Sequence, residues 1–333
     1  MLKIAINGFG RIGRAACKII LEKKGLEIVA INDLGNIKTL AYLMNFDTVY
    51  GRYGKKVTVA ADHLVIGDKK IQVLSEKDPA RLPWGQLGVD VVLECTGVFT
   101  KASDLDLHLK AGAKKVLLSA PSSEKDSVPT YIRGVNDDKY QGEKIIDNAS
   151  CTTNCIAPVM KVMCDEFGVE KSLMVTTHAY TATQLLVDGP DKKDPRRGRA
   201  GAANSAPSTT GAAIATTKAI PELKGIFDGT AIRVPVICGS IADITMVLKK
   251  ETTAEEINAK LQAAAEGKMK GVLKVSDEDI VSSDIIGTTE SAIVDLPFTK
   301  VVGGNLAKVV AWYDNEWAYS VRLVEMAEKI SNK

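Results

Sequence analysis

The stretch Gly8-Phe9-Gly10-Arg11-Ile12-Gly13 decides the fold of the N-terminal half of the chain. It follows a short apolar run, Ile4 to Ile6, and opens a segment whose apolar residues recur at helical spacing. Glycines between a strand and a helix let the backbone approach a pyrophosphate, which meets free amides and the positive end of the helix. Gly8, Gly10 and Gly13 are therefore predicted to bind a dinucleotide cofactor.

Asp33 is predicted to select that cofactor. It ends the second apolar run and follows Gly13 by 20 residues, a spacing that brings a carboxylate to a ribose diol. A carboxylate accepts hydrogen bonds from a 2′-hydroxyl but repels a 2′-phosphate, and Leu34 beside it adds no positive charge. The competing interpretation is a structural glycine turn followed by a surface aspartate. The spacing and flanks favour NAD, and NAD over NADP.

Short apolar runs continue through the first half of the chain. Those read as parallel strands buried on both faces are Ile4 to Ile6, Ile28 to Ile31, Val89 to Leu93, Val116 to Leu118 and Ile145 to Ile146. Three further runs predict a small antiparallel insertion, namely Val57 to Val59, Leu64 to Ile66 and Ile71 to Val73. Helix-like segments lie between several of the parallel runs. Residues 1–150 are therefore expected to form a Rossmann-type, doubly wound α/β domain.

The pattern changes after Cys151. A helix-like stretch extends to about Phe167, and the later strands alternate between apolar and polar residues. These strands are Ile232 to Val236, Ile241 to Leu248 and Leu306 to Trp312. They predict an α+β domain with a mainly antiparallel sheet covered on one face. Asp188 to Ala203 is expected to be a long ordered loop, and Trp317 to Ile330 an amphipathic helix.

Composition narrows the class of protein. Of 333 residues, 45% are hydrophobic and the formal net charge is +2, too balanced for binding nucleic acid by charge alone. Six cysteines occur without a CxxC pair or histidines at zinc-like spacing, so we expect reduced thiols and no metal site. The chain begins directly with strand-like sequence, without a leader, and no apolar stretch reaches bilayer length. The expected compartment is the cytoplasm.

Cys151 is the candidate nucleophile. The segment Ala149-Ser150-Cys151-Thr152-Thr153-Asn154-Cys155 joins a strand to a helix, so Cys151 falls in the first helical turn. The helix dipole and local amides stabilise a thiolate there, which predicts a lowered thiol pKa. Cys155, four residues on, is expected to be a small packing residue rather than half of a disulfide or metal pair.

His178 is the candidate base. It ends the strand-like run Leu173 to Thr177, where an imidazole can pair with a thiol and exchange protons with a substrate. A satisfied structural histidine is an equal alternative from the sequence alone. The two other histidines, His63 and His108, lie among polar residues and are expected to be solvated.

Five motifs resemble those of phosphorylating glyceraldehyde-3-phosphate dehydrogenases, in the family's order and across essentially the whole chain. They are Ile6 to Gly13, Ala149 to Cys155, Ser208-Thr209-Thr210-Gly211-Ala212-Ala213, Arg233-Val234-Pro235 and Trp312-Tyr313-Asp314-Asn315-Glu316-Trp317. The resemblance implies NAD-dependent oxidation of D-glyceraldehyde 3-phosphate to 1,3-bisphosphoglycerate, in glycolysis or gluconeogenesis. Cys151 would carry a thioester that inorganic phosphate releases, and His178 would act as base.

The resemblance also implies ligands for two phosphates and the cofactor. Thr181 and Arg233 match the substrate-phosphate ligands; Ser150, Thr152, Thr210 and Gly211 match those of inorganic phosphate, with Arg197 nearby. Cofactor contacts are implied at Arg11, Ile12, Lys77, Ser119 and Asn315. Residues 316–333 would complete the NAD-binding domain, leaving 151–315 as the catalytic domain. A homotetramer is implied as well.

Alternatives and departures accompany this interpretation. Erythrose-4-phosphate dehydrogenases share the Cys-His pair but need not bind inorganic phosphate, and a non-catalytic NAD- or RNA-binding protein is the alternative from another class. Val236-Ile237-Cys238-Gly239-Ser240 departs from the segment usual after Arg-Val-Pro. A basic cluster is interrupted by Asp191 and Asp194 and lacks interleaved aromatic residues, so nucleic acid is not an expected partner; its members are Lys192, Lys193, Arg196, Arg197 and Arg199.

Overall fold

The computed structural model describes residues 1–124, 126–191 and 194–331. The chain divides into two compact units. The first comprises Met1–Tyr131, Lys139–Ala149 and the segment from Ser320 onward, and the second comprises Ile132–Asp138 and Ser150–Tyr319. Ile132–Asp138 thus groups with the second unit, although the sequence places it in the first domain. Lys192, Lys193 and residues 332–333 of the segment expected to complete the NAD-binding domain lie outside the described residues.

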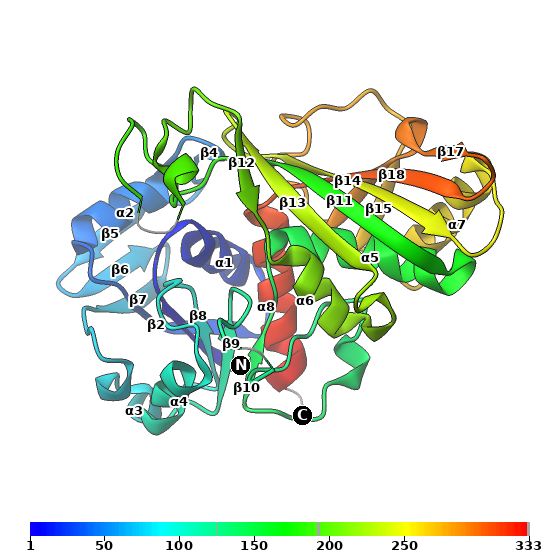
Figure 1. The fold of residues 1–333 in the computed structure, drawn as a ribbon. Coiled ribbons are helices and arrows are strands. Elements are labelled where there is room, and N and C mark those ends of the chain that lie inside the picture. Colours follow the sequence, from blue (N-terminus) through cyan, green and yellow to red (C-terminus); the bar gives the residue numbers. More distant parts are fainter. Residues whose placement is uncertain (125, 192–193, 332–333) are drawn as a thin grey trace. The chain divides into compact units, whose positions relative to one another are not determined.

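The first unit is built on a sheet that, within the described residues, has eight strands in the order β10-β9-β8-β1-β2-β7-β6-β5 (Figure 1). From β10 to β7 every neighbouring pair is parallel. The strands are β1 (Leu2–Asn7), β2 (Leu26–Asn32), β5 (Val57–Ala60), β6 (His63–Ile66), β7 (Lys69–Leu74), β8 (Val91–Glu94), β9 (Lys115–Leu118) and β10 (Ile145–Asp147). The apolar runs predicted as parallel strands are confirmed.

The predicted antiparallel insertion is only partly separate from this sheet. β5, β6 and β7 pair antiparallel with one another, as expected. However, β7 also pairs parallel with β2, with Gln72 opposite Ala30. The hairpins therefore extend the main sheet, because β7 fills the open edge of β2 that a doubly wound sheet would otherwise leave unpaired.

Helices accompany the strands of the first unit. They are α1 (Arg11–Glu22), α2 (Ile37–Asn45), α3 (Trp84–Leu87) and α4 (Ala102–Lys110), and two short strands, β3 (Phe46–Asp47) and β4 (Gly51–Arg52), pair with each other. The core between strands and helices is apolar: Trp84, Val89 and Val92 form one buried cluster, and Leu105 and Val116 belong to another.

The second unit contains a mixed sheet in the order β12-β13-β11-β14-β18-β16-β15. Its strands are β11 (Val169–Ala179), β12 (Ala206–Thr209), β13 (Phe227–Val234), β14 (Ser240–Leu248), β15 (Leu273–Ser276), β16 (Ala292–Asp295), β17 (Lys300–Val302) and β18 (Leu306–Tyr313). Most pairs are antiparallel, as predicted, but β11 with β13 and β15 with β16 are parallel. The helices are α5 (Cys151–Phe167), α6 (Ala212–Ala219), α7 (Ala254–Glu266) and α8 (Trp317–Ser331), the last of which enters the first unit at Ser320.

One face of this sheet is covered and the other is open. α5 packs on β11, β14, β16 and β18. Along β11 the side chains alternate, so that Ser172, Met174 and Thr176 are buried while Leu173 and Val175 are exposed. None of the helices that the structure describes is long and apolar enough to cross a bilayer.

Candidate functional site

The glycine turn has the geometry of a phosphate cradle. Gly8 has φ +93°, and a Cβ at this position would lie 2.6 Å from the amide nitrogen of Thr96. A Cβ at Gly13 would lie 2.1 Å from the carbonyl oxygen of Gly8. Around Gly10, in contrast, a Cβ would meet nothing within 4 Å. Two glycines thus permit close packing, and the third leaves the N-terminus of α1 open to an anion.

A cavity of about 530 Å³ adjoins this turn. Its lining includes Gly8, Gly10, Asp33, Lys77 and Thr96. Asp33 lies directly after β2, where Oδ2 accepts a hydrogen bond from the amide of Phe9 at 2.7 Å and Oδ1 accepts one from Gly35 at 2.7 Å. The structure therefore brings together the predicted turn, the predicted acid and Lys77 at the carboxyl edge of the parallel strands, where such sheets bind ligands.

Other predicted cofactor residues are engaged elsewhere. The guanidinium of Arg11 pairs with Asp47 at 2.6 Å and lies over the ring of Tyr50. Ile12 is half-buried in the first turn of α1. The Ser119 amide donates to the carbonyl of Glu94 at 3.0 Å. Asn315 belongs to the second unit, where its Oδ1 accepts from Gly239 at 3.2 Å and from the Ser240 hydroxyl at 2.9 Å. The segment that departs from the family's usual sequence thus fixes the orientation of Asn315.

Cys151 is the first residue of α5, as predicted. Ser150 caps the helix because its hydroxyl accepts a hydrogen bond from the Thr153 amide at 3.1 Å. Ala149, just before the cap, has φ +54° without being a glycine. Such a left-handed residue stores strain just before the start of α5. Cys155 is fully buried and not in a disulfide, which fits a packing residue.

His178 lies against Cys151. Its Nε2 is 3.5 Å from the sulfur of Cys151, and the ring is only 4% exposed. β11 places the imidazole there, because His178 continues the buried series of alternate residues that includes Thr176. A nitrogen placed beside the sulfur is the arrangement expected of a thiol–imidazole pair.

Burial disfavours a lone thiolate on Cys151 and a lone imidazolium on His178. It raises the pKa of the Cys151 thiol, although Arg233 and the hydroxyl and amide of Thr152 act to lower it. The lowered pKa expected from the sequence is therefore wrong, because depth of burial outweighs the helix N-terminus. Burial and Arg233 together lower the pKa of His178 to about 3. Burial thus favours the neutral thiol and the neutral imidazole, and proton transfer between the two would create both charges together.

Arg233 controls the far side of the imidazole. Its Nη1 lies 2.6 Å from Nδ1 of His178 and 3.1 Å from the carbonyl oxygen of Ala179. That carbonyl oxygen is also 2.6 Å from Nδ1. Nδ1 can accept from Arg233 or donate to Ala179, but not both. The choice decides whether Nε2, facing Cys151, carries the ring proton or can receive one.

A buried chain of hydroxyl groups lies next to Cys151 and His178. The hydroxyl of Tyr313 contacts Thr152 Oγ1 at 2.9 Å and Thr176 Oγ1 at 2.7 Å. Its ring packs edge-on against His178, with ring centroids 5.9 Å apart. Tyr313 belongs to the motif Trp312 to Trp317, in which the sequence predicts a role for Asn315 alone. Its position two residues after the buried Ala311 on β18 is the signal that points it inward.

The remaining predicted phosphate ligands are distributed over nearby loops and helix starts of the second unit. Arg197 donates to the Ser208 hydroxyl from Nη2 at 3.1 Å, and its charge acts on Arg233. Gly211 is the N-cap of α6, and the Thr210 hydroxyl accepts from the Ala212 amide at 3.2 Å. Thr181 contacts the hydroxyl of Thr183 at 2.9 Å. Of the predicted set, Arg233 contacts His178, and Thr152 hydrogen-bonds Cys151.

Comparison with known proteins identifies the family of the chain. Residues 2–102 match the model of the glyceraldehyde 3-phosphate dehydrogenase NAD-binding domain, and residues 150–315 match that of the C-terminal domain. The chain belongs to the glyceraldehyde 3-phosphate dehydrogenase family. It is 52% identical to the glyceraldehyde-3-phosphate dehydrogenase of Mycolicibacterium smegmatis over 98% of this chain and 97% of that protein. Identity is 49% to glyceraldehyde-3-phosphate dehydrogenase 1 of Kluyveromyces lactis, over 99% of this chain and 100% of that protein.

Membership also fixes the class of enzyme and cofactor. A third relative, the glyceraldehyde-3-phosphate dehydrogenase of Geobacillus stearothermophilus, is 48% identical over 100% of this chain and 99% of its own length. The chain is an NAD-dependent oxidoreductase of this family. The glycine cradle and the acid after β2 fit that cofactor, because they supply an anion site and a hydroxyl acceptor.

Proposed function

We propose that this chain catalyses the phosphorylating oxidation of D-glyceraldehyde 3-phosphate to 1,3-bisphosphoglycerate with NAD, in glycolysis or gluconeogenesis. The observation that carries the proposal is the 3.5 Å contact between Cys151 Sγ and His178 Nε2 at the start of α5. A buried thiol beside a buried imidazole suits nucleophilic attack on a carbonyl carbon. The full-length similarity to enzymes of this name supports the substrate.

Cys151 and His178 divide the chemistry. As the sulfur attacks the aldehyde carbon, the thiol proton passes to Nε2, and His178 returns it to the new alkoxide to complete a hemithioacetal. His178 takes the hydroxyl proton again when hydride leaves, which gives a thioester on Cys151. Inorganic phosphate then attacks the acyl carbon, the sulfur leaves, and His178 reprotonates it. Bound NAD supplies the hydride acceptor.

Two anion sites are part of the proposal. Arg233 and Thr181 would hold the phosphate of the substrate, while Ser150, Thr152, Thr210 and Gly211, with Arg197, would hold the attacking phosphate. The planar fork of a guanidinium and the open N-terminus of α6 are suitable donors for such anions. For the cofactor we propose the turn from Gly8 to Gly13, Asp33, Lys77, Ser119 and Asn315.

The covalent intermediate provides the decisive experiment. Protein mixed with substrate and NAD but no phosphate, then quenched and analysed by peptide mass spectrometry, should carry an acyl group on Cys151. Cys151→Ser should lower kcat by more than about a thousandfold, or about 4 kcal/mol, while retaining NAD binding. Cys155→Ser should retain the chemistry. An adduct on another residue, or a burst of NADH without any adduct, contradicts the mechanism.

Phosphate dependence separates this function from erythrose-4-phosphate dehydrogenase. Steady-state NADH production should require inorganic phosphate and should yield an acyl phosphate. Turnover to a free acid at the same rate without phosphate would favour the alternative. Absence of any NADH with either aldehyde would favour a non-catalytic NAD-binding protein.

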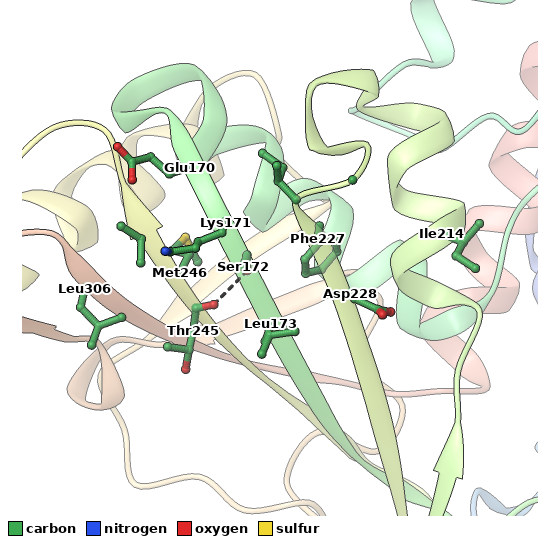
Figure 2. A pocket seen from close by; sticks show the side chains of 13 residues that line it. Glu170, Lys171, Ser172, Leu173, Ile214, Phe227, Asp228, Thr245, Met246 and Leu306 are labelled. Carbon is green, nitrogen blue, oxygen red and sulfur yellow. Dashed lines mark hydrogen bonds between the residues drawn. The ribbon is translucent and has the colours of Figure 1, made fainter.

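We also propose a homotetramer. The open face of the second unit's sheet forms an apolar depression of about 790 Å³, here called the sheet-face hollow (Figure 2). Leu173, Ile214 and Leu306 in its lining are 67%, 65% and 41% exposed. Exposed apolar side chains grouped on one face are typical of a surface that another subunit covers. The cytoplasm is the proposed compartment, which the six free cysteines of the described chain support.

A further inference from the structure

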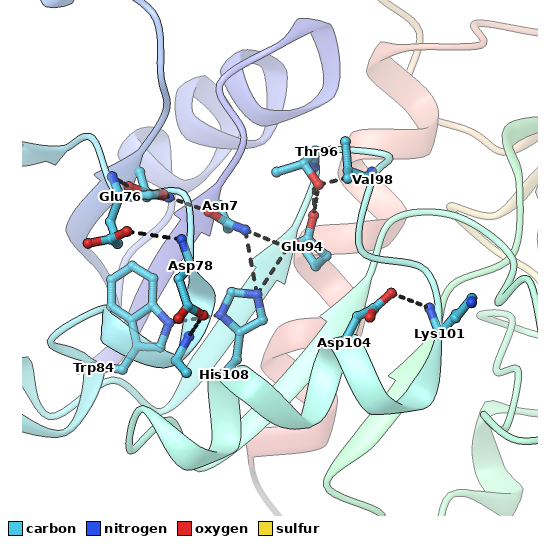
Figure 3. A network of polar contacts seen from close by, with 12 residues as sticks. Asn7, Glu76, Asp78, Trp84, Glu94, Thr96, Val98, Lys101, Asp104 and His108 are labelled. Carbon is cyan, nitrogen blue, oxygen red and sulfur yellow. Dashed lines mark hydrogen bonds and ion pairs between the residues drawn. The ribbon is translucent and has the colours of Figure 1, made fainter.

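His108, expected to be solvated, is completely buried. Its relative exposure is 0%, and it lies on α4 three residues after the equally buried Leu105. The Nε1–H of Trp84 donates to Nδ1 of His108 at 3.0 Å, and Nε2 of the ring lies 3.0 Å from Oε2 of Glu94 (Figure 3). Because indole nitrogen only donates, Nδ1 is the acceptor and the ring proton lies on Nε2, directed at Glu94.

Glu94 accepts hydrogen bonds from several polar groups around it. Its Oε2 also accepts from the Asn7 side-chain amide at 2.6 Å, and its Oε1 accepts from the amide of Thr96 at 2.8 Å and from the Thr96 hydroxyl. All these partners donate, and the carboxyl group is 0% exposed. A buried carboxyl group with this many donors is held in one orientation.

The contacts continue from Asn7 into the next strand. Asn7 Oδ1 accepts from Asn32 at 2.7 Å, and the Asn32 side chain bonds both the amide and the carbonyl of Glu76 at 2.9 Å. Asn32, Asn7 and Glu94 are opposite one another in register at the carboxyl ends of β2, β1 and β8. This row of polar residues therefore spans the edge of the sheet where the glycine turn begins.

Part of this network forms a wall of the 530 Å³ cavity. Asn7, Asn32, Glu76 and Thr96 all line it, whereas Trp84, Glu94 and His108 do not. Thr96 is also the residue against which Gly8 packs. A buried layer of side chains thus fixes residues that face the cavity, and the catalytic steps on Cys151 use none of them.

We propose that His108 is a positioning residue for cofactor binding. Together with Trp84 it fixes the carboxylate of Glu94, and Glu94 in turn fixes Asn7 and Thr96 in the wall of the cavity. The proposal rests on the placement of NAD in that cavity. Loss of the ring should remove one of the two donors to Oε2 of Glu94 and the acceptor of the Trp84 indole, so the wall should lose its single geometry before the fold is lost.

The test measures the Kd of NAD and of ADP-ribose by calorimetry, alongside the melting temperature. His108→Leu should weaken binding of both ligands about tenfold. His108→Gln should restore most of the affinity, since one amide can accept from Trp84 and donate to Glu94. Leu64→Ala, fully buried on β6 outside the network, serves as a matched destabilised control whose Kd should stay within about twofold of wild type. Trp84→Phe, a milder change, should weaken binding about threefold.

The outcomes separate the inference from its premise. If His108→Leu or Trp84→Phe lowers the melting temperature as Leu64→Ala does but leaves Kd unchanged, His108 is merely structural and the inference is wrong. Should His108→Leu not fold, Trp84→Phe alone decides. Asp33→Ala tests the placement of the cofactor. If the Kd of Asp33→Ala is unaltered, the premise and the inference are both overturned. If Asp33→Ala binds NAD more weakly but the His108 and Trp84 variants bind it with wild-type affinity, only the inference is overturned.

Discussion

Nη1 of Arg233 lies 2.6 Å from Nδ1 of His178. A guanidinium always donates, so in this contact Nδ1 accepts and the ring proton lies on Nε2, beside the sulfur of Cys151. If the substrate phosphate binds Arg233, as proposed, Nδ1 becomes free to donate to the carbonyl of Ala179, and Nε2 becomes able to receive the thiol proton. In the proposed mechanism, occupancy of the substrate-phosphate site would thus prepare His178 to accept the proton of Cys151.

The charge of Arg233 should be visible in the labelling of Cys151. Arg233 lowers the pKa of both the thiol and the imidazole, so Arg233→Ala should raise both. The pH profile of Cys151 alkylation by iodoacetamide should then move to higher pH, because the reactive thiolate forms later. Arg196→Ala, an exposed arginine of the second unit, should leave the profile in place. A downward shift in Arg233→Ala would contradict the electrostatic role.

Substrate selection should depend on the same side chain. Arg233→Ala should lower kcat/KM for the phosphorylated aldehyde at least about 30-fold, or about 2 kcal/mol, since charge-assisted hydrogen bonds to the phosphate are lost. The slow oxidation of unphosphorylated glyceraldehyde should change much less. Equal losses with both aldehydes would show general disruption of the His178 environment instead of lost phosphate binding.

Cofactor preference should depend on the acid after β2. Asp33→Ala combined with Leu34→Arg removes a carboxylate and adds a cation near the 2′-position, so the NAD over NADP ratio of kcat/KM should narrow more than about tenfold, or about 1.4 kcal/mol. Leu34 is 58% exposed, so the new arginine has room. Wild-type preference for NADP would refute this role of Asp33.

The hydroxyl of Tyr313 should contribute to the stability of the fold and to the binding of inorganic phosphate. Tyr313→Phe leaves Thr152 and Thr176 without their shared partner, which should cost about 1 to 3 kcal/mol of unfolding free energy. Because Thr152 is a proposed ligand of the attacking phosphate, the KM for phosphate should rise as well. Tyr140→Phe is the control: it removes another buried hydroxyl, bonded to Glu143, and should lower stability without altering that KM. If the KM for phosphate rises in both variants, the rise reflects lost stability and not a role of Tyr313 in phosphate binding.

Assembly should depend on the sheet-face hollow. Leu173→Glu places a charge among exposed apolar side chains and should shift the protein from four chains to smaller species in light scattering after size exclusion. Val281→Glu, at a position 55% exposed elsewhere in the second unit, should leave the mass unchanged. A Leu173→Glu protein that keeps the wild-type mass would place the subunit contacts elsewhere.

Local patterns predicted much of this fold. The apolar runs from Ile4 and Ile28 identify parallel strands because a strand buried on both faces has few alternatives. The pairing of β7 with β2, and of β11 with β13, did not follow from the sequence, because both depend on which sheet edges remain open once other strands have paired.

Site residues could be predicted where motif spacing fixes their position, and less well where their properties depend on burial in the folded structure. Cys151 at the start of α5 and Asp33 after β2 followed from motif spacing. The raised pKa of the Cys151 thiol and the burial of His108 did not follow from the sequence. Neighbours along the chain do not indicate which side chains pack against a residue in the folded structure. Helical spacing from Leu105 to His108 was the signal available for the burial of His108.

β11 carries His178 at its end and alternates buried Thr176 and Met174 with exposed Val175 and Leu173. A substitution on the exposed side leaves the buried side in place, so the two sets of residues can diverge independently during evolution. Inserting or deleting one residue would exchange the two sets and turn the imidazole away from Cys151. Length variation among natural variants should therefore fall in the loops at either end of β11 and avoid the strand itself.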